Sequence, residues 1–341
     1  MTDEQNEVNK IFQFIDTTTS ELRDDLNSSY SDALAENLSN ILDQKSYVNN
    51  GFPNEKQTKS LNKQYSDFSL KDYGLHDVKK AIELAIIKAQ RQDKVDVNHL
   101  MTPDVIGSLT ALMVLAIFKN YPNKKLRVID PAVGTSNLLY ETAIELKPNK
   151  INLQLSGIDN DESQLQIADS FANAINEEID LYHQDAIASW LKSDYDLAIS
   201  DLPVGYYPID ENTNTFATRA DKGHSYAHHL LIEQTMNNLH PNGVAMFIVP
   251  SQIFQTDQAK KLVDWMAKDE YLQAVLSLPE SLFASEAAAK SIIVLQKHGN
   301  ISKQSPNILM GQMPEMNNEA DVQSFKDQLQ TWSNQTFGWG K

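Results

Sequence analysis

A short apolar strand, a turn containing proline and glycine, and a helix follow one another between Arg127 and Leu146. The opening run has the composition of a buried parallel strand, which Asp130 and Pro131 end. Gly134 lets a ligand approach the backbone closely, and the N-terminus of the helix can accept a carboxylate or another polar group. By itself, this pattern fits an ordinary strand-to-helix turn as well as a ligand site.

The next strand favours the ligand site. Apolar residues alternate from Ile151 to Leu155, and the strand ends at Gly157-Ile158-Asp159. The separation of Asp130 and Asp159 fits one strand–helix–strand unit, in which an acid at the end of the second strand can hold two ribose hydroxyls. The unit offers a single glycine where a dinucleotide fold needs G-x-G-x-x-G, so a dinucleotide fold is not indicated.

The pattern Asp130-Pro131-x-x-Gly134-Thr135-Ser136-Asn137, followed by Gly157-Ile158-Asp159, resembles motifs I and II of class I S-adenosylmethionine (SAM) methyltransferases. It is most similar to the N6-adenine DNA methylase branch, which includes the modification subunits of type I restriction systems and small stand-alone YtxK-like relatives. The resemblance extends from about Asn98 to Lys297. Ser136 stands where the family usually has a second glycine, and we expect this small side chain to be tolerated.

The resemblance implies SAM as the cofactor. The family carries a Thr-Pro pair upstream of motif I, here Thr102-Pro103, where the threonine hydroxyl and a helix N-terminus hold the methionine carboxylate of SAM. The residues themselves predict a helix with Thr102 as its N-cap and with Pro103 and Asp104 in its first turn. The cofactor-binding residues expected from the resemblance are Met101, Thr102, Asp130, Ala132, Gly134, Asn137, Asp159, Asn160, Asp185, Ala186 and Asp201.

A further acid follows the third predicted strand, Ile179–Tyr182. In the family an acid at this place often accepts a hydrogen bond from the amino group of the cofactor's adenine, and the resemblance assigns this role to Asp185. A carboxylate is a suitable acceptor for such an amine. An aspartate after a strand is also common as a helix cap, so both interpretations stay open. We interpret His183 as a strand-end residue rather than a catalyst.

The fourth predicted strand, Tyr195–Ser200, leads into Asp201-Leu202-Pro203-Val204-Gly205, which resembles motif IV in its Asn-Pro-Pro-Phe-Gly form. An amino group conjugated to a base is a poor nucleophile. A side-chain oxygen and a backbone carbonyl that accept its two hydrogens direct the nitrogen lone pair toward the methyl sulfonium, and an aromatic ring stacks on the flipped base. The resemblance assigns the side-chain oxygen to Asp201 and the carbonyl to Leu202.

This segment departs from the family at two positions. Leu202 replaces the first proline, and Val204 replaces the stacking aromatic residue. We expect Tyr206 or Tyr207 to stack on the base instead. The predicted catalytic residues are therefore Asp201, Leu202, Pro203, Tyr206 and Tyr207.

The remaining strands complete an α/β fold. A turn at 240–243 precedes a fully buried strand at 244–250, and two more strands are predicted at 272–278 and 291–297. Between these two strands, Leu278-Pro279-Glu280-Ser281-Leu282-Phe283 resembles the Leu-Pro-x-x-Leu-Phe segment of type I modification subunits. The resemblance implies a Rossmann-like sheet of seven strands in the order 3-2-1-4-5-7-6, with a late antiparallel pair. After residue 300, one helix is expected over 321–332.

The N-terminal part reads as helical. Apolar residues at helical spacing predict helices over 8–42, with a break at Thr17-Thr18-Thr19-Ser20, and again over 75–91, whereas 47–54 is a loop by composition. The predicted domains are an N-terminal helical domain (1–95), a SAM-dependent methyltransferase domain (96–300) and a C-terminal extension (301–341). The N-terminal helices could cap a substrate, mediate dimerisation, dock a partner or cover one face of the core.

Composition limits the function classes. The chain of 341 residues has no cysteine, which excludes disulfides and thiol chemistry. Its polar N-terminus and the absence of a long apolar run predict a cytoplasmic protein without a membrane segment. His228-His229 lack the cysteine or carboxylate spacing of a metal site, so we expect no metal and interpret both as surface or packing residues.

The formal net charge of −17 argues against a strong general nucleic-acid binder. We interpret the basic tract Lys119, Lys124, Lys125 and Arg127 as a solvated loop. No segment remains for a target-recognition domain, so any nucleic-acid binding is expected to be weak, unspecific and sensitive to salt.

Together these features predict a SAM-dependent N-methyltransferase that acts on the exocyclic amine of adenine in DNA or RNA. Two alternatives stay open. One is a protein-glutamine methyltransferase, because release-factor glutamine methylases use a similar Asn-Pro-Pro-Tyr motif. The other is a SAM-binding protein that regulates or docks a partner and carries a decayed catalytic loop.

Overall fold

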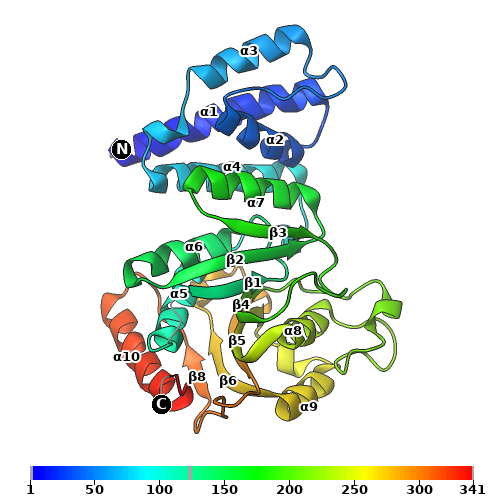
Figure 1. Cartoon of the computed structure of the whole chain (residues 1–341), viewed down its shortest axis with the longest axis vertical. Coiled ribbons are helices and arrows are strands. Elements are labelled where there is room, and N and C mark those ends of the chain that lie inside the picture. Colours follow the sequence, from blue (N-terminus) through cyan, green and yellow to red (C-terminus); the bar gives the residue numbers. More distant parts are fainter. Residues whose placement is uncertain (1–2, 122–124, 340–341) are drawn as a thin grey trace. The chain divides into compact units, whose positions relative to one another are not determined.

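The computed structural model describes residues 3–121 and 125–339 (Figure 1). Met1 and Thr2 of the polar N-terminus, Lys124 of the basic tract and the last two residues of the predicted extension lie outside these ranges. The chain divides into two compact units. The first comprises Met1–Met101, Gly134–Ser136 and Asp161–His183, and the second comprises the remaining residues.

The first unit is mainly helical. It contains α1 (Asp3–Leu26), α2 (Tyr30–Asp43), α3 (Glu55–Ser66), α4 (Leu75–Asp93), α7 (Glu162–Ile175) and strand β3 (Ile179–His183). Helix α2 packs against α1, α4 and α7. The helices bury their apolar faces, with Ile11, Ile15 and Leu34 fully buried. This agrees with the predicted helical N-terminus, and α4 confirms the helix predicted over 75–91.

The break predicted at Thr17–Ser20 is wrong, because α1 runs through it to Leu26. Thr18 donates its hydroxyl hydrogen to the carbonyl oxygen of Phe14 at 2.8 Å, and the Asn37 amide donates to the hydroxyls of Thr18 and Thr19. Threonine hydroxyls satisfied in this way can stay inside a helix. The chain instead turns at Asn27, where φ is +52°, and the Ser29 side chain caps α2.

The segment after α2 holds one element that the sequence analysis missed. Residues 47–54 form the predicted loop, and α3 follows it directly. Asn54 caps α3 by accepting from the backbone N–H groups of Lys56 and Gln57, while the Gln57 side chain accepts from the Asn54 N–H. This reciprocal capping box fixes the start of a helix whose apolar pattern is weak.

The strands form one mixed sheet in the order β3-β2-β1-β4-β5-β7-β6-β8. Strand β1 is parallel to β2 and β4, β4 is parallel to β5, and β7 runs antiparallel between β5 and β6. The predicted seven-strand order is confirmed, and β8 adds an edge strand parallel to β6. The bounds are β1 Lys125–Asp130, β2 Asn152–Asp159, β4 Tyr195–Asp201, β5 Leu239–Pro250, β6 Glu270–Ser277, β7 Lys290–Lys297 and β8 Leu309–Gln312.

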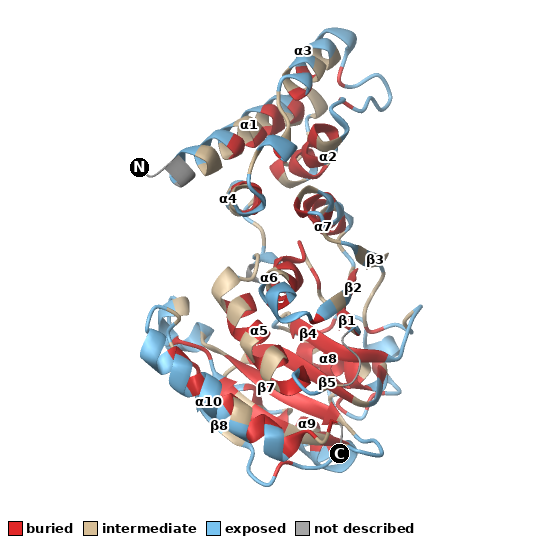
Figure 2. Cartoon of the chain, turned by 60° about the vertical axis from the view of Figure 1, so that its left-hand side comes forward, coloured by how far each residue is buried: buried red, intermediate tan, exposed pale blue. Residues whose placement is uncertain are grey.

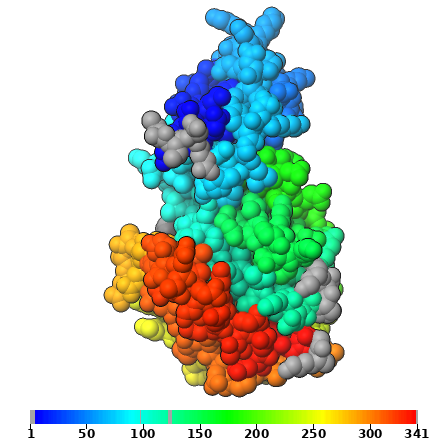
Figure 3. Space-filling model, turned by 90° about the vertical axis from the view of Figure 1, so that its left-hand side faces the viewer, coloured from blue at the N-terminus to red at the C-terminus, as the bar shows by residue number. Residues whose placement is uncertain are grey.

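Helices cover the sheet of the second unit. They are α5 (Asp104–Phe118), α6 (Asn137–Leu146), α8 (Ala227–Asn237), α9 (Ala259–Asp269) and α10 (Glu319–Thr336). Helix α5 packs between α6 and α10, α8 packs on β5, and α9 packs on β6. Strands β4 and β7 are almost entirely buried, and β5 is buried from Gly243 to Val249 (Figure 2). Helix α10 presents many exposed side chains (Figure 3).

Seven short 3-10 turns complete the described elements: Leu70–Asp72, Val97–His99, Lys147–Asn149, Asp210–Thr213, Ile253–Gln255, Glu280–Leu282 and Glu286–Ala288. The turn predicted at 240–243 is instead part of β5. Its pairing with β4 shifts register there, and Asn242 has φ +72°, so the residues form a bulge rather than a separate turn. None of the described helices is long and apolar enough to cross a membrane.

Gly157 on β2 leaves room for the turn that follows β1. A Cβ atom at this position would lie 2.6 Å from Cγ2 of Val133. The backbone N–H of Val133 donates to the carbonyl of Ile158 at 3.0 Å, so the turn after β1 is fastened to β2 where only a glycine leaves room. The glycine of the Gly157-Ile158-Asp159 motif is therefore required by packing.

We predict that Gly157→Ala destabilises the protein by about 1–3 kcal/mol, the usual cost of overpacking a filled site. Gly311→Ala is the matched control, because no heavy atom lies within 4 Å of its added Cβ. The control should change the free energy of unfolding by less than about 0.5 kcal/mol. Chemical denaturation of both variants measures the difference, and equal stabilities would contradict the packing argument.

Candidate active site

The carboxyl ends of β1, β2 and β4 bring several of the predicted residues together in the second unit. Ile129 pairs with Ala198, so Asp130 and the Ser200-Asp201 pair reach the same end of the sheet. Asp159 ends β2 beside them in the strand order. Open parallel sheets bind ligands at this end, because the loops after the strands converge there.

Asp130 is a buried carboxyl with defined partners. Its Oδ1 accepts hydrogen bonds from the backbone N–H of Ala132 at 2.9 Å and from the hydroxyl of Ser200 at 2.5 Å. Burial raises the pKa of Asp130 to about 7, with smaller contributions from the charges of Asp201 and Asp159, and its two hydrogen bonds oppose the rise. Asp130 therefore shapes the turn after β1 and ties it to β4.

Asp201 joins three distant segments. Its Oδ2 accepts from the Thr102 hydroxyl at 3.1 Å, and its Oδ1 accepts from the Lys290 ammonium at 2.6 Å. Thr102 precedes α5, Asp201 ends β4 and Lys290 begins β7. The contact brings together the two segments that the resemblance assigns to the cofactor and to the methyl acceptor.

The N-cap predicted at Thr102 is wrong. Helix α5 begins at Asp104, Pro103 is its N-cap, and no side chain caps it. Thr102 lies one position before the N-cap residue, and its hydroxyl donates to Asp201. Asp104 does lie in the first helical turn, as predicted.

Asn137 begins α6 and presents an unpartnered atom. Its Nδ2 donates to the carbonyl of Thr102 at 2.7 Å and to the Asp104 carboxylate at 2.9 Å. Its Oδ1 is buried without a hydrogen-bond partner among the described residues, and so is the hydroxyl of Ser136. Buried polar atoms rarely stay unsatisfied, so these two oxygens are candidates for ligand contacts.

The turn between β1 and α6 contains two residues in the left-handed region, Gly134 at φ +50° and Ser136 at φ +67°. Glycine adopts this conformation without steric cost, which explains why the family favours a glycine at the position of Ser136. Ser136 is accommodated there and buried. Gly134 and Ser136 both belong to the first unit.

Tyr207 and Asp185 are engaged with one another. The Tyr207 hydroxyl donates to Oδ2 of Asp185, and Asn212 donates to the same hydroxyl at 2.9 Å. Oδ1 of Asp185 accepts from the backbone N–H of Ile187 at 2.9 Å, but a turn rather than a helix follows, so the helix-cap interpretation is wrong. Burial, followed by the contact with Asp185, raises the pKa of Tyr207 to about 12. Tyr207 thus anchors the loop after β4 and is itself buried.

Tyr206 has the opposite environment. Its side chain is 56% exposed and stacks on Tyr226, with ring centroids 4.7 Å apart and planes 16° from parallel. The backbone N–H of Ala227 donates to the carbonyl of Gly205, and that of Tyr207 donates to Ser225. These bonds fold the loop back on itself and hold Tyr206 at the surface. Val204, at the family's stacking position, is 44% exposed.

His228 and His229 are buried packing residues, so the surface alternative is wrong for both. Burial lowers the pKa of His228 to about 4 and that of His229 to about 3, which leaves both neutral near pH 7. Both rings lie against Tyr226. Among the described residues, no group of three histidine or acidic side chains is arranged to hold a metal ion.

The other predicted residues are divided between the two units. Leu202 and Pro203 follow Asp201 directly, with Leu202 buried, and Asp159 and Ala186 are partly exposed. Asn160 is exposed, and Met101 belongs to the first unit. The sequence analysis missed Ser200, Tyr226 and Lys290. Only Ser200 had a local signal, because it is a polar residue directly before Asp201 at the end of an apolar strand.

The basic tract is not a solvated loop. Lys125 and Arg127 lie in β1, and Arg127 forms an ion pair with Asp196 at 3.3 Å. Lys119 donates to the Gln330 side chain at 3.0 Å. A β-strand and two side-chain contacts therefore order the described part of this tract.

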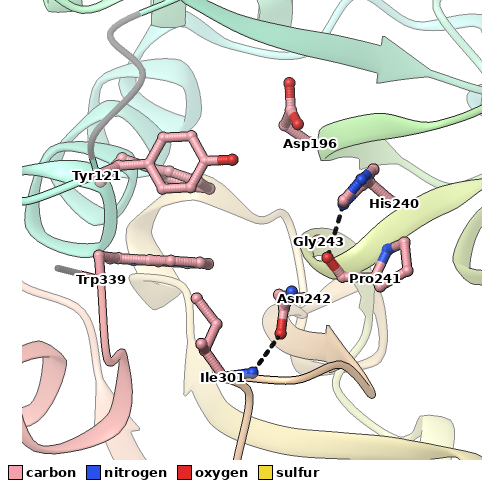
Figure 4. A pocket seen from close by; sticks show the side chains of 9 residues that line it. Tyr121, Asp196, His240, Pro241, Asn242, Gly243, Ile301 and Trp339 are labelled. Atoms are coloured by element: carbon pink, nitrogen blue, oxygen red, sulfur yellow. Dashed lines mark hydrogen bonds between the residues drawn. The ribbon is translucent and has the colours of Figure 1, made fainter. Parts of the chain in front are cut away.

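A pocket of about 200 Å³ lies away from this site, near the amino ends of β4 and β5 (Figure 4). Tyr121 and Trp339 form one side of it, and Asp196, His240 and Asn242 face them (Figure 4). Asp196 is paired with Arg127, His240 contacts the carbonyl of Pro241, and Asn242 accepts from the Ile301 N–H. These three polar side chains thus have partners within the protein, and we assign no function to this pocket.

Comparison with known proteins identifies the family of this chain. The N-6 DNA Methylase family matches residues 76–337, and the YtxK N-terminal helical domain matches residues 9–90. The chain is 34% identical over 330 residues to Bacillus subtilis YtxK, a protein without an assigned function. The match covers 96% of this chain and 98% of that protein.

Solved structures give the same picture. A Listeria monocytogenes protein, provisionally described as a class I SAM-dependent methyltransferase, superposes with a TM-score of 0.86 at 30% identity, covering 96% of this chain and 99% of that one. A type I restriction-modification methyltransferase subunit from Streptococcus thermophilus superposes with a TM-score of 0.62 at 13% identity, covering 93% and 74%. At that identity the second match shows the fold alone.

The raised pKa of Asp130 predicts a pH dependence of stability. Its folded pKa of about 7 exceeds the ordinary value of 3.8, so the folded state holds this proton more tightly than the unfolded state. The stabilisation is complete below about pH 4 and is lost as the pH rises through 7. Asp130→Asn should remove this loss while keeping an acceptor for Ser200.

Denaturation of wild type and Asp130→Asn across this range measures the difference. Burial also raises the pKa of Glu270 to about 8, which adds a similar slope to both proteins and cancels in the comparison. The variant should gain relative stability between pH 4 and 7. Parallel curves would show that Asp130 ionises normally in the folded protein.

Proposed function

Because the chain belongs to the N-6 DNA methylase family, we propose that it transfers the methyl group of SAM to the exocyclic amino group of adenine in nucleic acid. The observation that supports this most is the contact of Thr102 with Asp201, which joins the expected cofactor segment to the expected acceptor segment across 99 residues. The fold alone would not support an activity, because one fold can host many functions.

The residues at the strand ends fit SAM as the cofactor. Asp159 offers carboxylate oxygens to ribose hydroxyls, and the unpartnered Oδ1 of Asn137 can accept a hydrogen from a polar ligand. We assign the methionine end of SAM to Thr102 and to Asn137, which donates to the carbonyl of Thr102. When bound, SAM supplies an electrophilic methyl group on a sulfonium.

Asp201 is the proposed acceptor for the target amine. A carboxylate oxygen that accepts one N–H hydrogen, with the Leu202 carbonyl accepting the other, directs the nitrogen lone pair toward the methyl group. The new N–C bond forms as the S–C bond breaks, and the amine releases one proton to solvent. Thr102 has one hydroxyl hydrogen and donates it to Oδ2 of Asp201 in this structure, so it must turn away from Asp201 to donate to the carboxylate of SAM, which opens Oδ2 to the amine.

Tyr206 is the proposed stacking residue. Of the two candidate tyrosines, Tyr206 is exposed and Tyr207 is buried with its hydroxyl engaged. A ring whose other face rests on Tyr226 presents a rigid surface to a base. This arrangement supports a tyrosine two positions after the family's usual aromatic as the stacking group.

A second candidate function is binding of SAM without transfer. Both oxygens of Asp201 are occupied, and an aliphatic residue holds the usual stacking position. In that case the protein would regulate or dock a partner. The exposed side chains Tyr47, Val48 and Phe52 of the first unit offer a surface for a protein partner or a second copy. We propose that nucleic acid binds only weakly, because of the net charge of −17.

We predict that Asp201→Ala abolishes methyl transfer and leaves SAM affinity nearly intact, because Asp201 acts on the acceptor. Asp159→Ala should instead act on the cofactor. It should weaken SAM binding by about 1–3 kcal/mol through lost charge-assisted hydrogen bonds. Transfer of tritium from labelled SAM to DNA, RNA and lysate protein measures activity, and calorimetry measures binding. If wild type binds SAM tightly but transfers no methyl group to any fraction, the methyltransferase proposal fails and the SAM-binding proposal takes its place.

Tyr206→Ala should weaken acceptor binding by about 1–3 kcal/mol, the usual contribution of a stacked base and aromatic ring. Tyr206→Phe is the matched control, since it keeps the ring and should keep affinity. The Michaelis constant for the acceptor, measured with labelled SAM, tests both variants. If both variants behave like wild type, Tyr206 does not stack on the acceptor.

A further inference from the structure

We propose that Asp201 and Lys290 act as one recognition pair, which reads an amino group together with the ring nitrogen next to it. The inference rests on the proposed function and specifies its substrate as a base with an amidine-type edge, such as adenine. Lys290 is then a specificity-determining residue for methyl transfer, with the ammonium group donating to the base and the carboxylate accepting from it.

The sheet places these side chains together. Strand β5 lies between β4 and β7. Asp201 pairs with Ile248 on β5, and Pro250 on β5 pairs with Lys290 on β7. The Lys290 side chain therefore spans one strand to reach Oδ1 of Asp201, at 2.6 Å. Its position at the carboxyl end of β5 puts the ammonium at the same end of the sheet as the proposed acceptor site.

The pair has capacity for a ligand. The Lys290 side chain is 25% exposed and that of Asp201 is 17% exposed, so both are partly open to solvent. An ammonium has three N–H donors, and among the described residues the structure pairs Lys290 with Asp201 alone. Two N–H groups remain for a ligand, and each carboxylate oxygen can accept more than one hydrogen bond.

The chemistry of the pair matches adenine. Adenine presents an amino donor beside a ring acceptor, N1 on one side and N7 on the other. Asp201 can accept from the amino group while Lys290 donates to the adjacent ring nitrogen. A simple alkylamine contacts only the carboxylate and gives Lys290 no acceptor, so it makes one contact where adenine makes two. The pair thus favours a base over an isolated amine.

The charges support the same reading. An isolated carboxylate must lose hydration when a neutral base covers it, and nothing in the base compensates for the charge. Lys290 neutralises Asp201, so the pair presents one donor and one acceptor with no net charge. A partly exposed ion pair adds little to folding stability, so stability alone gives a weak reason for placing a lysine here.

The test compares an oligonucleotide containing one adenine with matched oligonucleotides that contain 1-deazaadenine or 7-deazaadenine. Each analogue keeps the amino group and replaces one ring nitrogen by carbon. Wild type should methylate one of the two analogues about ten-fold or more slowly than adenine, the discrimination expected for one arm of a two-point contact. The slow analogue identifies which ring nitrogen Lys290 contacts.

Lys290→Met should remove this preference and bind SAM as wild type does, whereas Lys290→Arg should restore part of it. Lys297→Met is the matched control. Lys297 lies on the same strand, donates to the carbonyls of Asn237 and Leu239, and should leave the preference unchanged.

Each result decides the inference. Equal rates of wild type on adenine and both analogues would overturn the recognition pair and leave adenine methylation standing. A preference that survives in Lys290→Met would also overturn it. If wild type transfers no methyl to adenine while it binds SAM, the proposed function fails and the recognition pair falls with it.

Discussion

The carboxylate of Asp201 is the contact on which the candidate site depends. One oxygen accepts from Thr102 ahead of α5, and the other accepts from Lys290 on β7, so a single side chain links three parts of the chain that are distant in sequence. Because Thr102 has one hydroxyl hydrogen, it can donate to Asp201 or to a bound ligand but not to both, so Asp201 couples the cofactor segment to the acceptor segment. The same geometry explains why the cofactor and acceptor segments meet at β4.

The turn after β1 gives this centre a fixed foundation. Asp130 is buried and holds both its own turn and Ser200, next to Asp201. Val133 fills the space that Gly157 leaves on β2. The motif residues of β1 and β2 therefore act through packing and hydrogen bonds within the protein, in addition to any contact with a ligand. This internal role is the reason that a single added methyl group is expected to matter.

The sequence predicted the sheet well and the side-chain contacts poorly. Apolar runs and the resemblance located β1 to β7, whereas β8 escaped because Leu309–Gln312 is largely exposed and has little apolar pattern. The helix break predicted at Thr17–Ser20 was wrong because the Thr18 hydroxyl donates to a backbone carbonyl within α1, which composition does not show. The Lys290 contact spans 89 residues and depends on the register of β5, which no local pattern encodes. The sequence left Tyr206 and Tyr207 as equal candidates for stacking, and only their exposure in the structure distinguishes them.

A crystal structure of the protein with S-adenosylhomocysteine tests the central claim most directly. The account predicts the product's carboxylate at Thr102, its ribose hydroxyls at Asp159, and a Thr102 hydroxyl turned away from Asp201, which leaves one carboxylate oxygen open beside Lys290. A product bound elsewhere, or a Thr102–Asp201 hydrogen bond that persists at 3.1 Å with the product in place, would contradict it.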